Sequence, residues 1–125
     1  MTENEYILVV DDDQAIREAL SDALELEGYR VVGVEHGAAA MRHLESGARP
    51  CLILLDLMMP VMDGKAFRAA MLGEPALMDI PVVVITAGGP HLAAAMNALE
   101  VLHKPLSMNT VMDVVKEHCP GGAVA

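Results

Sequence analysis

The sequence predicts a single α/β domain built on a five-stranded parallel sheet flanked by helices. The chain has 125 residues, near the usual size of one domain. Along it, short apolar runs rich in β-branched residues alternate with amphipathic stretches. This alternation is typical of strands that helices cover on both faces of a parallel sheet. The expected strands are Tyr6–Val10, Arg30–Val34, Cys51–Leu55, Val82–Ile85 and Val101–His103.

The stretches between these strands have the spacing of amphipathic helices. In the first, Ile16, Leu20 and Leu24 fall on one face, and Gly28 supplies a helix stop. In the last, Ser107 stands where an N-cap belongs. The expected helices are Gln14–Glu27, His36–Ser46, Lys65–Leu72, Pro90–Leu99 and Ser107–His118.

Composition and charge limit the possible partners and the organisation of the chain. A formal net charge of −10 argues against direct binding to nucleic acid or an anionic membrane, because both need a basic face. No apolar run approaches the roughly 18 residues of a membrane-spanning helix, and residues 1–5 do not have the pattern of a signal peptide. We therefore expect a cytoplasmic protein that acts through protein contacts, with a domain over residues 1–119 and a short flexible tail over 120–125.

The cysteines and histidines show no pattern of a shared site. Cys51 and Cys119 have neither a framework spacing nor a nearby metal-type partner, so we expect two structural thiols. The five histidines form no i,i+4 pair. None of them is expected to bind a ligand or carry a phosphoryl group.

Reactive side chains follow the expected strands at their carboxyl ends, where ligands bind in open α/β sheets. Asp11 and Asp12 follow the first strand and Asp56 follows the third. These three carboxylates would repel one another unless a cation lay among them, and an oxygen-only set suits Mg²⁺. Lys104, after the fifth strand, can pair with an anionic phosphoryl oxygen, and Thr86, after the fourth, offers a hydroxyl donor.

These motifs resemble a known family, the receiver domains of two-component response regulators. The resemblance covers essentially the whole chain and rests on four ordered motifs. They are Ile7-Leu8-Val9-Val10-Asp11-Asp12-Asp13, Leu54-Leu55-Asp56-Leu57-Met58-Met59-Pro60 with Met62-Asp63-Gly64, Thr86-Ala87, and Lys104-Pro105.

The resemblance implies a function and a set of site residues. A histidine kinase or phosphotransfer protein would donate a phosphoryl group to Asp56 in a Mg²⁺-dependent reaction. Asp11, Asp12 and Asp56 would bind the Mg²⁺, and the backbone carbonyl of Met58 would complete the metal shell. Thr86 would act as the hydroxyl switch. The chain would then be a stand-alone receiver, a signalling switch rather than an enzyme, that acts on a downstream protein target.

The resemblance also implies details of the fold. It predicts a flavodoxin-like (βα)5 three-layer sandwich with the strand order 2-1-3-4-5. It further implies a cis peptide bond before Pro105.

Two departures from the family pattern concern the fourth helix. The family commonly carries an aromatic residue where this chain has Val101. The segment from Thr86 to Lys104 is also shorter than usual by about four residues, roughly one helical turn. We therefore expect a shortened fourth helix. Because Leu92–Leu99 is apolar nearly all round, one face would remain for a partner or for a homodimer.

Three alternatives remain open at the level of sequence. Asp12 and Asp13 could simply cap the first helix. Asp11 and Asp13 have the Asp-x-Asp spacing of haloacid-dehalogenase-type phosphohydrolases, although Thr86-Ala87-Gly88-Gly89-Pro90 offers none of the further carboxylates that such enzymes place after a later strand. Finally, the chain could be a receiver-like binding module that no longer uses phosphate.

Overall fold

The chain forms one parallel sheet with helices on both faces. The computed structural model describes residues 6–47, 49–57, 64–87 and 98–119. The elements in chain order are β1 (Ile7–Val10), α1 (Gln14–Leu26), β2 (Val31–Val34), α2 (Gly37–Glu45), β3 (Leu52–Asp56), α3 (Gly64–Leu72), β4 (Val82–Thr86), β5 (Glu100–His103) and α4 (Met108–His118). All five strands are parallel, in the order β2-β1-β3-β4-β5. The predicted fold class and strand order are confirmed.

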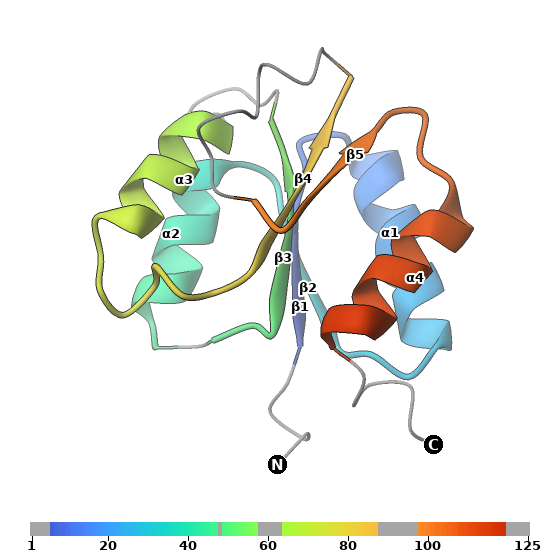
Figure 1. Cartoon of the computed structure of the whole chain (residues 1–125), viewed down its shortest axis with the longest axis horizontal. Helices are drawn as coiled ribbons and strands as arrows, with labels where there is room; N and C mark the ends of the chain where they lie inside the picture. The colour runs from blue at the N-terminus through green and yellow to red at the C-terminus, as the bar shows by residue number, and fades with distance from the viewer. Residues whose placement is uncertain (1–5, 48, 58–63, 88–97, 120–125) are drawn as a thin grey trace.

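The helices divide into two layers. Helices α2 and α3 cover one face of the sheet, and α1 and α4 cover the other (Figure 1). Because successive side chains of a strand point to opposite faces, each strand contributes to both layers. In β1, Leu8 and Val10 belong to a buried cluster with Phe67 of α3, whereas Ile7 and Val9 belong to one with the buried side chains of α1 and α4.

The caps predicted for the helices are present. The Asp13 carboxylate accepts hydrogen bonds from the backbone N–H groups of Ala15 and Ile16 at the start of α1. At its end, Gly28 has a φ of 96°, and the amides of Gly28 and Tyr29 return to carbonyls of the last turn. This is a Schellman motif, which needs a residue that tolerates the left-handed region. The Ser107 hydroxyl caps α4 as expected.

The expected helix Pro90–Leu99 falls almost wholly outside the described residues. Ala98 and Leu99, which are described, are not helical. The shortened fourth helix and the flexible tail over 120–125 therefore stay predictions, and the helix labelled α4 is the one expected over Ser107–His118. Within the described ranges, no helix has the length and apolar character to cross a membrane.

The prediction of two separate thiols is wrong. Cys51, just before β3, forms a disulfide with Cys119, which directly follows α4, and their Cα atoms are 6.2 Å apart. This Cα separation lies in the normal range for a disulfide. The two residues are 68 positions apart, so the spacing gave no sign that the amino end of a central strand lies next to the end of the last helix.

Two leucines at the end of α1 test the packing of this helix. Leu24 is fully buried, whereas Leu26 is 87% exposed. Leu24→Ala should therefore reduce the free energy of unfolding by about 2–5 kcal/mol, because it leaves a cavity in the core. The matched control Leu26→Ala should change it by no more than about 0.5 kcal/mol. Urea denaturation followed by circular dichroism measures both values, and equal losses would contradict the assigned face.

Candidate functional site

The carboxyl ends of β1 and β3 place two aspartates side by side. Val10 lies opposite Leu55 in the parallel register, so Asp11 stands level with Asp56 on the neighbouring strand. Both side chains are buried, with exposed fractions of 1% and 2%. Asp12, the next residue along the chain, is exposed. Carboxylate oxygens of Asp11, Asp12 and Asp56 lie within 4.8 Å of one another.

One carboxylate oxygen of Asp11 accepts a hydrogen bond, and the other does not. Its Oδ1 accepts a hydrogen bond of 2.9 Å from the Asp13 amide. Its Oδ2 is buried and accepts none. A buried carboxylate oxygen without a hydrogen bond is costly, and a neighbouring carboxylate adds repulsion. The chemistry of this donor set therefore fits a hard divalent cation such as Mg²⁺, which prefers oxygen ligands.

Lys104 brings a positive charge to the same place. Its Nζ lies 3.7 Å from Asp11 Oδ2 and 3.5 Å from Asp56 Oδ2. These are ion-pair distances rather than hydrogen bonds, which agrees with the unsatisfied Asp11 oxygen. Among the ion pairs of residues 6–47, 49–57, 64–87 and 98–119, a single ammonium faces these carboxylates, so negative charge is in excess. Binding of a further cation is thus favoured electrostatically.

Thr86 and Lys104 are fixed to each other through the backbone. Thr86 is the last residue of β4 and is fully buried. Its carbonyl accepts a hydrogen bond of 2.9 Å from the Lys104 amide, which sets where Lys104 leaves β5. The peptide bond between Lys104 and Pro105 is cis, as the resemblance implied.

Asp12 and Asp13 have different positions, which resolves one alternative. The Asp13 carboxylate caps α1, whereas the Asp12 carboxylate lies in the acidic cluster. The helix-cap interpretation therefore holds for Asp13 and not for Asp12. Because the Asp13 carboxylate is engaged with the helix, the Asp-x-Asp pair of a dehalogenase-type phosphohydrolase is not assembled here.

Sequence reasoning missed Arg17. Its Nη1 donates a hydrogen bond of 2.8 Å to the Asp11 carbonyl, so α1 holds the backbone of the acidic cluster. The side chain crosses β2 at Gly33, where a Cβ would lie 3.1 Å from Arg17 Cγ. A glycine inside a strand pattern often marks such a close approach, and this was the signal available in the sequence.

Two further predictions from the sequence have different outcomes. Met58 lies outside the described residues, so its carbonyl stays a predicted ligand. Val101 is half-buried and packs against the cluster beneath α2 and α3. It is a small side chain where the family commonly has an aromatic one.

An apolar hollow opens beside Lys104. It has a volume of about 290 Å³ and lies between α1 and the segment that leads from β5 to α4. Its lining residues are Ile16, Ala19, Leu20, Lys104, Pro105, Leu106 and Met108. An apolar surface thus borders the acidic cluster on the side of α1.

Fold and site together define the class of protein. The family model described as response regulator receiver domain matches residues 7–116. Sporulation initiation phosphotransferase F of Bacillus subtilis is 32% identical over 123 residues, covering 94% of this chain and 95% of that protein. Response regulator protein FleR of Pseudomonas aeruginosa is 35% identical over 119 residues, covering 92% of this chain and 24% of that protein. The chain belongs to the response regulator receiver domain family of two-component systems.

Solved structures agree with this assignment. The signal receiver domain of a signal transduction histidine kinase from Syntrophus aciditrophicus has a TM-score of 0.85 and 34% identity, covering 94% of this chain and 91% of that one. Chemotaxis protein CheY4 of Vibrio cholerae has a TM-score of 0.82 and 28% identity, covering 91% of this chain and 98% of that one.

The acidic cluster predicts how one substitution affects stability without metal. Asp12→Asn removes a charge that repels Asp11 and Asp56, so it should melt no lower than the wild type in EDTA. It should also gain less from added Mg²⁺, whereas the wild type gains about 2.7 kcal/mol when Mg²⁺ is at 100 times its Kd. Thermal melts with and without Mg²⁺ provide the measurement.

Asp13→Ala is the matched control for this pair of adjacent carboxylates. Loss of the N-cap should lower stability by about 1 kcal/mol while leaving the gain from Mg²⁺ unchanged. If Asp12→Asn lowered the stability in EDTA more than Asp13→Ala does, Asp12 would be the helix cap and Asp13 the member of the acidic cluster.

Proposed function

We propose that this receiver domain accepts a phosphoryl group on Asp56 and acts as a phosphorelay switch. The observation that carries the proposal is the buried Asp56 carboxylate with Asp11 beside it and Lys104 Nζ within 4 Å of both. A histidine kinase or phosphotransfer protein would be the donor. Family membership supports this donor class, as does a relative whose name is phosphotransferase.

The transfer follows from the chemistry of a carboxylate nucleophile. An Asp56 oxygen attacks the phosphorus of the donor's phosphohistidine, the P–O bond forms, and the P–N bond breaks. The electron pair of that bond returns to the donor imidazole, which takes up a proton. The product on this chain is an acyl phosphate. A divalent cation held by Asp11, Asp12 and the predicted Met58 carbonyl would supply positive charge to the phosphoryl oxygens.

The other two residues act on the new anion. Lys104 now faces two carboxylates, and after transfer its ammonium can pair with a phosphoryl oxygen instead. Thr86 offers a hydroxyl donor at the neighbouring strand end, and hydrogen bonds to a charged acceptor are the stronger kind. Both residues thus hold the phosphoryl group once it arrives.

The apolar hollow beside Lys104 supports docking of the donor on this side. A donor has to bring its phosphoryl group to the carboxyl edge of the sheet. The surface between α1 and Pro105 borders that edge and offers apolar contacts. The strongly acidic charge of the chain favours a protein partner over nucleic acid.

Phosphoryl uptake should require Asp56 and a divalent cation. With acetyl phosphate and Mg²⁺, intact-protein mass spectrometry should detect one added phosphoryl group on the wild type. Asp56→Ala should abolish this adduct, because it removes the nucleophile, and EDTA should suppress it by removing the cation.

Asp79→Ala is the matched control, because Asp79 is an exposed aspartate that lies before the amino end of β4, away from the carboxyl ends of the strands. It should be modified like the wild type. An undiminished phosphoryl adduct in Asp56→Ala would contradict the proposal. Absence of uptake in the wild type would favour the phosphate-independent binding module.

Activation should reach the segment that follows Thr86. Once Asp56 is modified, the Thr86 hydroxyl should move toward the new anion and pull on residues 87–90, which include two glycines. Since Val101 is not aromatic, the segment 87–99 would shift as a unit and present its face to a downstream target or a second copy of the chain. Amide hydrogen exchange with and without beryllofluoride, which mimics the phosphoryl group, measures the change in protection over residues 87–99.

Thr86→Val serves as the control for that measurement, because it keeps the shape of the side chain but removes the hydroxyl. Protection over residues 87–99 should change in the wild type and not in Thr86→Val. If wild-type changes stay within residues 11–13 and 56–64, the signal takes another route.

A further inference from the structure

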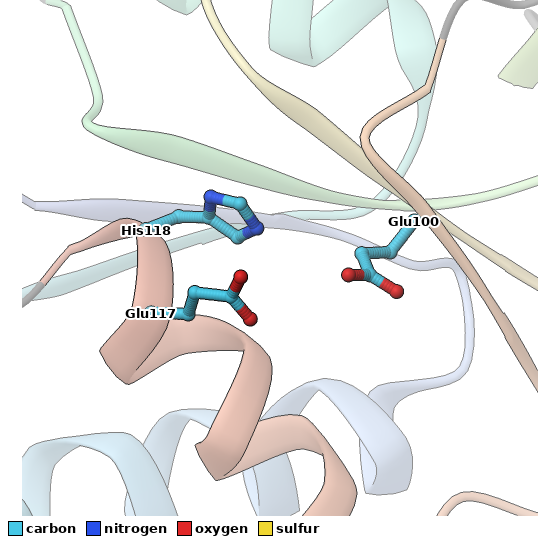
Figure 2. Close-up of side chains that lie close together, drawn as sticks. All are labelled: Glu100, Glu117 and His118. Atoms are coloured by element: carbon cyan, nitrogen blue, oxygen red, sulfur yellow. The ribbon is translucent and has the colours of Figure 1, made fainter.

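A second group of ligand-type side chains lies at the opposite end of the sheet. Glu100 begins β5, and Glu117 and His118 end α4. One ligand atom from each of the three lies within 4.8 Å of the others. Figure 2 shows the two carboxylates and the imidazole ring turned toward a common space.

This cluster is separate from the Asp56 site. Glu100 is the first residue of β5, whereas Lys104 directly follows its last residue. Four residues of strand span about 13 Å at roughly 3.3 Å per residue. Helix α4 runs back along the sheet, so its carboxyl end reaches the edge of the sheet at which β1 and β3 begin (Figure 1).

The His118 side chain is half-buried and turns one ring nitrogen away from solvent. Its Nε2 is inaccessible to solvent and has no hydrogen-bond partner. A buried polar atom left unpaired costs about 1–3 kcal/mol, so such an atom normally has a partner. Here the atom belongs to a ring that faces two carboxylates, and neither carboxylate hydrogen-bonds to it.

Two neighbouring groups are already engaged and do not serve the cluster. Lys116 pairs with Glu27 at 3.0 Å, and this hydrogen bond raises the pKa of the Lys116 ammonium. Cys119 is held in the disulfide with Cys51. The sequence neighbours of Glu117 and His118 on both sides are therefore directed elsewhere.

We propose that Glu100, Glu117 and His118 form a binding site for a divalent transition-metal ion, with Zn²⁺ as the best match. Imidazole nitrogen and carboxylate oxygen are both ligands that Zn²⁺ takes in proteins. Two carboxylates also balance its charge, and the helix C-terminus favours a cation at this position. A tetrahedral ion would keep one position for water.

The donor atoms separate this site from the acidic cluster at the other end. Mg²⁺ prefers an all-oxygen set such as Asp11, Asp12 and Asp56, whereas imidazole selects Zn²⁺, Ni²⁺ or Cu²⁺. A metal ion bound by Glu100, Glu117 and His118 would link the start of β5 to the end of α4. Those two elements are joined in sequence only through Lys104 and the segment after it.

The site is tested with Co²⁺ as a spectroscopic stand-in for Zn²⁺, using the full chain in excess Mg²⁺ to fill the acidic cluster. The wild type should develop visible d–d absorption that Zn²⁺ displaces, and Zn²⁺ should raise its Tm. His118→Ala and Glu100→Gln should each weaken Zn²⁺ binding by more than about tenfold in a competition titration.

His103→Ala is the matched control, because His103 is an exposed histidine at the far end of the same strand. It should bind Zn²⁺ like the wild type. Should His118→Ala fail to fold by circular dichroism, the isosteric Glu100→Gln decides. Unchanged Zn²⁺ affinity in His118→Ala and Glu100→Gln would overturn the proposal. Loss of Zn²⁺ binding in Asp12→Asn alone would also overturn it, because the ion would then lie in the acidic cluster. Neither result bears on the proposed phosphoryl site, which has its own tests.

Discussion

The burial of two carboxylates side by side at the edge of an apolar sheet is the central constraint in this molecule. Asp11 and Asp56 lie level on neighbouring strands whose other residues are fully buried. Like charges in such a place repel, and only Lys104 pairs with both among the ion pairs of the described residues. The excess negative charge favours a cation, and in the function proposed above a bound cation would in turn favour an anionic phosphoryl group.

The rest of the fold keeps these groups in place. Asp13 anchors the start of α1, and Arg17 on that helix holds the Asp11 carbonyl. The Lys104 amide is bonded to the end of β4. Each of these side chains thus leaves a rigid element at a fixed point, as the proposed phosphoryl transfer requires. The two ends of β5 also differ in chemistry, with oxygen ligands near Lys104 and a mixed nitrogen and oxygen set at Glu100.

Most of the fold and of the proposed site could be predicted because the signals are local. Apolar runs mark the strands, and Asp13, Gly28 and Ser107 mark helix ends through bonds to residues close in sequence. Strand-end positions of Asp11, Asp56 and Lys104 then follow from the rule that parallel strands end at one edge. The disulfide, the contact of Arg17 with Gly33 and the Glu100 cluster could not be predicted in this way, because each one depends on how a helix packs against the sheet.

The sequence by itself predicted the five strands and the four described helices, and which reactive side chains stand at strand ends, because periodicity and capping act over a few residues. Only the tertiary structure decided that Cys51 meets Cys119, that Arg17 crosses Gly33, and that the His118 nitrogen is buried facing two glutamates. Those contacts depend on how α1 and α4 pack on one face of the sheet. That packing is set by the shapes of many buried side chains together, which no short segment of sequence contains.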